Sequence, residues 1–335
     1  MRDLPVIDMS ALRDARSRGG GDIEVTAAAI DAACRDTGFF YVVGHGVPRE
    51  LQVRVETRAR EFFARPESEK AKIAMRYGGR AWRGWFPLEG ELTSGVPDLK
   101  EGLYFGEELT PEDPRVRAGL PLHGANQFPE HPVELRAAVL AYIDAVTRVG
   151  HALLLGISVA LGLEPGWFDR HLTAAPTVLF RIFRYPQLVD GAEQWSVGEH
   201  TDYGLLTILA QDDVGGLEVH ARDGWVAAPP IADAFVVNLG DMLERMTGGR
   251  YRSTPHRVRN TFARDRLSLP LFLDPAWDAE VLAVPDAPAR DVAADTRRWD
   301  GASVHDWSGT YGDYLLAKVA KVFPALLDDV MPGAT

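Results

Sequence analysis

The spacing of apolar residues is helical along much of the first half of the chain. Residues 24–37 and 48–63 place apolar side chains three and four positions apart, which predicts two amphipathic helices. Pro48 suits the first position of the second helix. Between them, the apolar run GFFYVVGHGV at 38–47 predicts a buried strand. Residues 131–163 predict one long helix, with a short helix following at PGWFDRHL.

The spacing of apolar residues changes from a helical to a strand-like pattern between residues 176 and 275. Apolar runs of strand length are separated there by DDVGG, RDGW, PPIAD and TGGRY, which are typical of turns. The runs are TVLFRIFRYP, LLTILAQ, LEVHA, WVAAP, AFVVNLG, HRVRN and LSLPLFLDP. Many short strands at regular spacing indicate a β-sandwich or barrel. A last helical pattern, YGDYLLAKVAKVFPALLDDV, follows.

These patterns predict a mainly β protein with added helices. We expect a double-stranded β-helix (jelly-roll) core, flanked by N-terminal helices and by a C-terminal helix. Residues 1–128 would form a region of helices, loops and short strands. Residues 129–335 would hold the long helix, the jelly-roll catalytic domain and the last helix. We interpret the two regions as one integrated unit.

Composition excludes several classes of protein. The net charge of −12 over 335 residues argues against a surface that binds nucleic acid, since such surfaces are basic. The single cysteine, Cys34, cannot form an intrachain disulfide, which favours a reducing, cytoplasmic location. The N-terminus shows no secretory signal, and no apolar run approaches the length of a membrane span, so we expect no membrane partner. The oligomeric state is not indicated, and a monomer is compatible with the sequence.

A first chemical signal lies in GEHTDYG. His200 and Asp202 are two positions apart, so an extended backbone would direct both side chains to one face. An imidazole and a carboxylate placed in this way can meet one cation. By itself the signal is weak, because His-x-Asp arises often by chance.

A second histidine strengthens it. His256 in STPHRV follows about 54 residues later, at the start of a strand-like run. Two histidines and one carboxylate form the facial triad of non-haem iron(II) oxygenases, which leaves one face of the metal open to reactants. Zinc hydrolases also use two histidines and a carboxylate, so the ligands do not decide the metal.

A third element, DRLSLP, follows His256 by about ten residues. Arg266 and Ser268 are again two apart and would share one face of a strand. Arginine can hold a carboxylate with two parallel hydrogen bonds, and the serine hydroxyl adds another donor. One end of the barrel could therefore hold a metal and an anionic co-substrate.

At these residues the chain resembles the isopenicillin N synthase-like branch of the 2-oxoglutarate/iron(II) dioxygenases. The resemblance rests on HTDYGLLTILAQDDVGGLEV, on the segment from WVAAPPIADAFVVNLGDMLERM to STPHRV, and on DRLSLPLFLDP. It extends to LPVIDMS and DTGFFYVVGHGV near the N-terminus. The family fold is a distorted jelly-roll barrel with an N-terminal helical domain.

The resemblance implies that His200, Asp202 and His256 bind Fe(II). It also implies that Arg266, Ser268 and Tyr185 bind the distal carboxylate of 2-oxoglutarate. The enzyme would then use O2 to oxidise a small organic substrate, with hydroxylation as the expected reaction, releasing succinate and CO2. Many members carry Asn two positions before the tyrosine, where this chain has Phe183.

Several alternatives stay open at this point. Members that do not use 2-oxoglutarate also carry Arg-x-Ser, so an oxidase without this co-substrate, or an ethylene-forming enzyme, fits the same motifs. A metal hydrolase could use the same ligands, and a non-catalytic binding barrel could keep the fold alone. The prime substrate is not indicated.

Aromatic side chains around two loops suggest walls of a substrate pocket. We expect these walls to include Tyr203, next to Asp202, and residues of AWRGWFPLEGE and DLKEGLYFG, a region that borders the active site in related enzymes. Arg83 or Lys100 would contact an anionic group. The alternative is that the aromatics only pack the helical region onto the barrel. The predicted substrate residues are Trp82, Arg83, Lys100, Tyr104, Phe105 and Tyr203.

Overall fold

A computed structural model describes residues 3–13, 21–93, 95–187, 194–260, 264–287 and 303–323. The strands are β1 (Val6–Asp8), β2 (Phe39–Val43), β3 (Gly84–Phe86), β4 (Glu101–Gly106), β5 (Thr177–Tyr185), β6 (Gln194–His200), β7 (Leu206–Gln211), β8 (Leu217–Ala221), β9 (Gly224–Ala227), β10 (Phe235–Leu239), β11 (His256–Asn260) and β12 (Arg266–Asp274). The α-helices are α1 (Ser10–Arg13), α2 (Gly21–Asp36), α3 (Arg49–Phe63), α4 (Glu67–Lys70), α5 (Pro114–Arg117), α6 (Leu135–Ala160), α7 (Trp167–His171), α8 (Asp241–Met246) and α10 (Tyr311–Val322).

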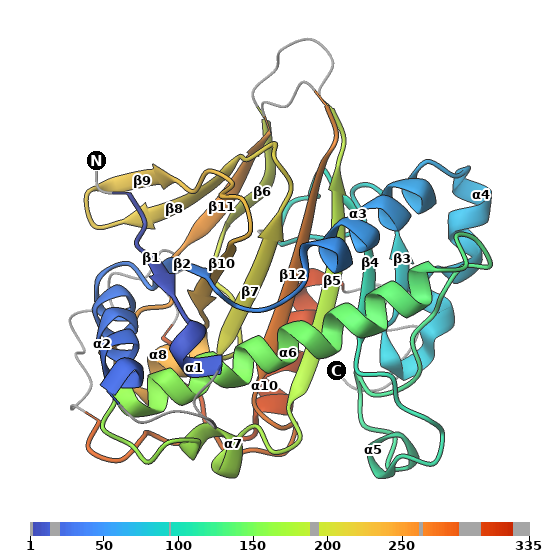
Figure 1. The fold of residues 1–335 in the computed structure, drawn as a ribbon. Helices are drawn as coiled ribbons and strands as arrows, with labels where there is room; N and C mark the ends of the chain where they lie inside the picture. Colours follow the sequence, from blue (N-terminus) through green and yellow to red (C-terminus); the bar gives the residue numbers. More distant parts are fainter. Residues whose placement is uncertain are drawn as a thin grey trace.

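Two sheets make up the core of the described structure. The larger has the strand order β1-β2-β10-β7-β12-β5-β4-β3, and the smaller has the order β6-β11-β8-β9. All pairs are antiparallel except β1 with β2. Helix α6 crosses one side of the larger sheet, with α3 beside it, and α10 lies on the other side (Figure 1). The fold prediction of a mainly β jelly roll with flanking helices is confirmed.

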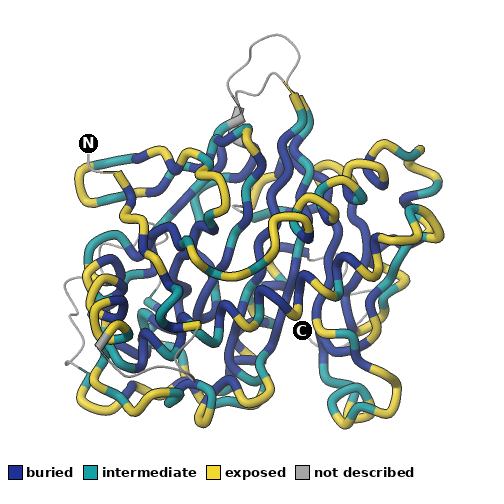
Figure 2. The backbone as a smooth tube through the Cα atoms, viewed as in Figure 1, coloured by how far each residue is buried: buried dark blue, intermediate teal, exposed yellow. Residues whose placement is uncertain are grey.

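The N-terminal region contributes strands to the same sheet as the barrel. β1 and β2 extend it at one edge, and β3 and β4 extend it at the other. The buried apolar residues form one cluster that includes Phe40 from β2, Leu103 from β4 and Leu271 from β12. Figure 2 shows this burial along the central strands, with exposed residues on the outer turns. No separate core divides the described chain near residue 128.

Most predicted elements lie where the pattern placed them, with three differences. Pro48 precedes the first helical residue of α3, as its N-cap. Strand β6 was not predicted, because QWSVGEH carries few apolar residues and its strand geometry depends on pairing with β11. Helix α10 ends at Val322, and the rest of the predicted last helix lies outside the described residues. Cys34 is buried on α2.

Helix α6 is the one helix of the described ranges that could cross a membrane by length and composition. This corrects the expectation that no apolar stretch reaches such a length. The helix packs against β7 and β12 and against α2 and α3. It buries Tyr142, Val146 and Leu153 among others, so it has the contacts of a core helix.

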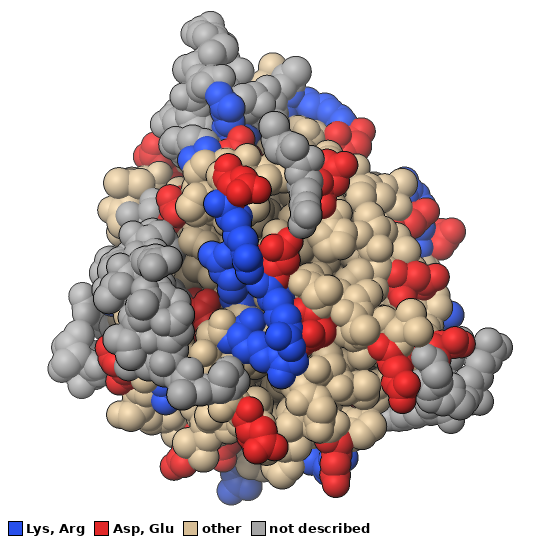
Figure 3. All heavy atoms as spheres, turned by 90° about the vertical axis from the view of Figure 1, so that its left-hand side faces the viewer, with Lys and Arg blue, Asp and Glu red and all other residues tan. Residues whose placement is uncertain are grey.

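One face carries a band of basic side chains that the net charge did not predict. Figure 3 looks onto the side where β8, β9 and α2 lie, and shows Lys and Arg gathered next to carboxylates. Arginines pair with carboxylates of β8 and α2: Arg257 of β11 lies 2.8 Å from Glu218, and Arg222, between β8 and β9, lies 3.5 Å from Asp36.

Candidate metal centre and co-substrate pocket

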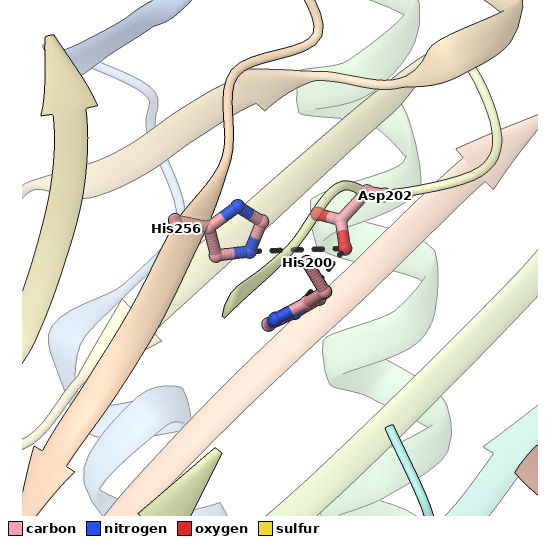
Figure 4. A group of neighbouring side chains, drawn as sticks. All are labelled: His200, Asp202 and His256. Carbon is pink, nitrogen blue, oxygen red and sulfur yellow. Dashed lines mark ion pairs between the residues drawn. The ribbon is translucent and has the colours of Figure 1, made fainter. Parts of the chain in front are cut away.

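Three predicted ligands come together on the inner faces of the barrel. His200 ends β6, His256 begins β11, and the two residues are direct partners across these strands, so their imidazoles share one face. Asp202 lies just beyond β6. Its Oδ1 is 4.0 Å from Nε2 of His200 and 3.8 Å from Nε2 of His256 (Figure 4). One ligand atom from each residue lies within 4.8 Å of the others.

Backbone carbonyls set the orientation of both imidazoles. Nδ1 of His200 lies 2.8 Å from the carbonyl oxygen of Gly198, and Nδ1 of His256 lies 3.2 Å from that of Thr254. An imidazole that donates from Nδ1 keeps the lone pair on Nε2 for a metal. Both Nε2 atoms face Asp202, so this pattern fits a metal centre.

Two hydrogen bonds fix the carboxylate of Asp202 on the side away from the histidines. Its Oδ2 accepts hydrogen bonds from Nδ2 of Asn238 at 2.7 Å and from Oγ1 of Thr207 at 2.5 Å. Its Oδ1 is left to face the histidines. Neither donor was predicted from the sequence. The available signal was a polar residue within an otherwise apolar strand, FVVNL for Asn238.

Electrostatics favour the ligand forms of these side chains. Burial, followed by the charge of His256, lowers the pKa of His200 to about 3, so His200 is neutral at physiological pH. Burial alone would raise the pKa of Asp202. The nearby histidines and the hydrogen bonds from Asn238 and Thr207 outweigh it and lower this pKa. A neutral imidazole and an ionised carboxylate are the forms that bind a metal.

The triad opens into a cavity with about 1020 Å³ of space not filled by protein, part of it open to solvent. Arg266 lines this cavity and is 1% exposed. Its Nη2 donates to Oε1 of Gln211 at 3.2 Å, but its Nε and Nη1 have no partner among the described residues. Buried guanidinium donors without acceptors are costly, which fits a site for a carboxylate supplied by a ligand.

Ser268 and Tyr185 stand beside this guanidinium. Tyr185 is the cross-strand partner of Arg266, and its ring centroid lies 4.8 Å from Cζ of Arg266. The Ser268 hydroxyl lies 3.4 Å from the Tyr185 hydroxyl, and both residues line the cavity. The structure therefore brings together all three residues predicted for the co-substrate.

Two predicted substrate residues, Lys100 and Tyr203, line the same cavity. Nζ of Lys100 is paired with Asp98 at 2.7 Å and with Glu91 at 2.9 Å. Tyr104 lies next to this group and donates a hydrogen bond to Glu91. Contact of any of these residues with a substrate stays a prediction.

Trp82, Arg83, Tyr104 and Phe105 do not line the cavity, contrary to the prediction. The Arg83 guanidinium is buried and donates to the carbonyl oxygens of Phe105 and Leu122. Phe105 follows Tyr104 on β4, so it points to the opposite face, where it packs on Phe180. The aromatic pattern alone did not show which face of β4 would meet the metal.

The sequence also missed a cation inside the cavity and the cover above it. Arg181 lines the cavity from the middle of β5. The cover comes from α10 and the residue after it, whose cavity-lining side chains are Leu315, Val319, Val322 and Phe323. Side chains alternate between the two faces of a strand, so the sequence TVLFRIFRYP could have shown that Arg181 and Tyr185 share one face.

A jelly roll whose inner face holds two histidines, one carboxylate and a buried arginine with unpartnered donors defines a non-haem iron oxygenase. Two family models match the chain. One is described as the N-terminal region of the non-haem dioxygenase in morphine synthesis and matches residues 4–131. The other is described as the 2OG-Fe(II) oxygenase superfamily and matches residues 176–275.

Relatives cover nearly the whole chain. A probable iron/ascorbate oxidoreductase of Dictyostelium discoideum is 43% identical over 99% of this chain and 98% of its own. A 1-aminocyclopropane-1-carboxylate oxidase of Dictyostelium mucoroides is 33% identical over 96% and 95%. A homoarginine-6-hydroxylase of Arabidopsis thaliana is 36% identical over 84% and 87%.

The crystal structure of a full-length Neurospora crassa protein in complex with alpha-KG, which is 2-oxoglutarate, superposes with a TM-score of 0.77 at 25% identity, covering 95% of this chain and 96% of that one. The chain belongs to the 2OG-Fe(II) oxygenase superfamily. It is an iron(II)- and 2-oxoglutarate-dependent oxygenase that oxidises a small substrate, as the sequence predicted.

Proposed function

We propose that this oxygenase hydroxylates a C–H bond of a small organic substrate, with Fe(II) on His200, Asp202 and His256. Arg266 holds the distal carboxylate of 2-oxoglutarate, with Ser268 and Tyr185 as further donors. The observation that carries the proposal is the pair of buried, unpartnered nitrogens of Arg266 in the cavity that the triad lines. A carboxylate of the co-substrate supplies an acceptor that the described protein does not offer to these donors.

Bound iron with 2-oxoglutarate and O2 supplies the oxidising chemistry, in which 2-oxoglutarate becomes succinate and CO2. The protein supplies binding, orientation and exclusion of water. Asn238 and Thr207 hold Oδ2 of Asp202 and so aim its Oδ1 toward the histidines. Apolar side chains of α10 and β5 cover the cavity, and a dry site strengthens the contact between Arg266 and its anion.

Two alternatives are less well supported. The aminocyclopropane-carboxylate oxidase relative raises the alternative of an oxidase that needs no 2-oxoglutarate. In such an oxidase, the unpartnered nitrogens of Arg266 would have no role. A metal hydrolase on the same ligands is disfavoured by the family match, which is to oxygenases and an oxidoreductase. We place the chain in the isopenicillin N synthase-like branch on its motifs.

The names of two relatives, a homoarginine hydroxylase and an aminocyclopropane-carboxylate oxidase, support small amino acids as the first substrates to assay. We further propose that the enzyme acts in the cytoplasm, on a diffusible molecule, without a nucleic-acid or membrane partner. The single cysteine and the net charge of −12 support this setting.

The experiment is anaerobic reconstitution with Fe(II), followed by succinate release with O2 over a panel of metabolites. Arg266→Met should raise the 2-oxoglutarate concentration needed for half-maximal rate at least about tenfold, because hydrogen bonds to a charged group are worth roughly 1.5–3 kcal/mol. Arg264→Met is the matched control, since Arg264 is mostly exposed two residues earlier and should leave that concentration unchanged. An undiminished rate without 2-oxoglutarate would overturn the proposal.

A further inference from the structure

Arg181 is a cavity cation that neither the metal nor the co-substrate site uses. Its guanidinium makes no hydrogen bond to any described residue, and its Nε is buried without a partner. The nearest carboxylate oxygen, Oε1 of Glu91, is 3.6 Å from Nη1, beyond hydrogen-bond distance. A guanidinium has five N–H donors, and leaving buried donors unpaired costs free energy. This side chain is therefore short of acceptors in the protein alone.

Both faces of this guanidinium are covered by aromatic rings. Its Cζ lies 4.2 Å from the ring centroid of Tyr104 on β4 and 4.8 Å from that of Phe272 on β12. β4 and β12 flank β5 on opposite sides, so the rings stand on either side of Arg181. With rings on two sides, the edge of the guanidinium is the approach that suits a ligand. Edge-on approach matches a planar carboxylate, which accepts two parallel hydrogen bonds.

Lys100 is the other cavity cation that could bind an anionic group of a substrate, but protein carboxylates already neutralise its charge. Its ammonium lies between Asp98 and Glu91, at 2.7 and 2.9 Å, and donates to Thr93 at 3.2 Å. Its charge is matched by carboxylates of the protein. Arg181 is thus the cavity cation with hydrogen-bonding capacity left over.

The strand register places Arg181 on the level of the metal ligands. Phe272 of β12 pairs with Thr207 of β7, whose hydroxyl holds Asp202, and with Leu179 of β5, two residues before Arg181. Arg266 instead pairs with Tyr185, four residues further along β5, which is about 13 Å at the rise of a strand. The two arginines therefore serve different ends of the cavity.

We propose that the substrate of this enzyme carries a carboxylate and that Arg181 binds it edge-on, which determines the C–H bond presented to the metal. The inference rests on the proposed function, in which Arg266 is reserved for 2-oxoglutarate. The part of the substrate that faces the side chains of Phe183, Val319 and Phe323 is then apolar. Arg181 is then the residue that determines specificity for an organic acid.

The test uses small carboxylates with apolar bodies of increasing size, each paired with its primary amide of the same shape. Affinity is measured by calorimetry on the anaerobic enzyme loaded with Fe(II) and 2-oxoglutarate, where no turnover occurs. At least one carboxylate should bind about tenfold or more tightly than its amide. Arg181→Met should reduce that affinity to the affinity for the amide, and Arg181→Lys should restore it only in part, because it lacks the planar fork.

Two controls separate this inference from the proposed function. Arg148→Met removes a positive charge from an exposed position on α6 and should change neither affinity. Arg181→Met should bind 2-oxoglutarate as tightly as the wild type. If 2-oxoglutarate is consumed but every amide matches its carboxylate, or no carboxylate binds, or neutral heterocycles such as thymine bind better, the inference is wrong while the proposed function stands. Loss of 2-oxoglutarate consumption itself contradicts the proposed function.

Discussion

Asp274 is a buried carboxyl group at the end of β12, only 3% exposed. It accepts a hydrogen bond from the Tyr311 hydroxyl, and it lies against Gly204, where a Cβ would come within 1.4 Å of Oδ1. Burial raises its pKa to about 7. An unfolded aspartate titrates near pH 3.9. The folded state therefore favours the protonated form, and the stability from this preference is full below about pH 4 and is lost as pH rises to about 7.

We predict that Asp274→Asn flattens this dependence, since the amide has the shape of the carboxyl and no charge. The free energy of unfolding of the variant minus that of the wild type should be larger, meaning a relatively more stable variant, at about pH 8 than at about pH 5.5, on either side of the folded pKa. Urea denaturation of the metal-free proteins at both pH values measures it. Asp278→Asn, at an exposed position four residues later, controls for loss of a carboxyl. A difference that does not change with pH would show that Asp274 is not the group responsible.

The side chains behind the metal ligands give a second prediction at this scale. Asn238→Leu removes the donor to Oδ2 of Asp202 but keeps the approximate shape. Loss of such an outer partner commonly costs roughly 10–100-fold in metal affinity, so we expect iron(II) to bind about tenfold more weakly or worse. Anaerobic titration with Fe(II) measures this, and Thr207→Val should act in the same direction. Unchanged affinity in both variants would show that Asp202 needs no support.

The Arg-x-Ser pair could be predicted from sequence because both residues lie on one strand, where period-two alternation fixes the shared face. For the triad, the His-x-Asp spacing gave two ligands, and His256 was added through its residue type and the family resemblance. Asn238, Thr207 and Arg181 could not be predicted, since their roles depend on which strands become neighbours. Arg83 was assigned wrongly for a related reason. It lies in a loop-rich region, where nothing local shows whether a cation meets the cavity or backbone carbonyls.

At the scale of elements, the close approach of α6 to the larger sheet depends on Gly150. A Cβ at this position would lie 2.5 Å from Cδ2 of Leu273 on β12. Gly150→Val should therefore destabilise the protein by roughly 1–3 kcal/mol, as overpacked cores do. Glycine is a poorer helix former than valine, so helix propensity alone would make Gly150→Val slightly stabilising. Ala141→Val, at an exposed position on α6, shows the effect of valine in this helix away from the sheet. Chemical denaturation measures both, and a Gly150→Val variant as stable as the wild type or more stable would mean that the sheet moves aside without cost.

The hydrophobic pattern predicted most of the helices and strands, but not all of them. Periodicity located α3, α6 and the strongly apolar strands, whose residues are buried on one or both faces. It missed β6, whose polar sequence becomes a strand through its pairing with β11. Such a strand carries no local signature, although it ends in a metal ligand.

For the whole molecule, the shared sheet predicts cooperative unfolding. β1 to β4 from the N-terminal region flank strands from the C-terminal region in one sheet, with one hydrophobic cluster. Calorimetry should give a single transition, whose midpoint rises when Fe(II) and 2-oxoglutarate are added, because ligands that bind only the folded state stabilise it. Two separate transitions would show that the regions divided at residue 128 fold independently.

The buried, partly satisfied guanidinium of Arg266 also has a consequence for the lifetime of the protein in the cell. Cellular proteases act on transiently opened chains, whose population falls as folded-state ligands accumulate. We therefore expect this enzyme to be degraded more slowly in cells rich in 2-oxoglutarate. Its abundance, and not only its rate, would then follow carbon supply.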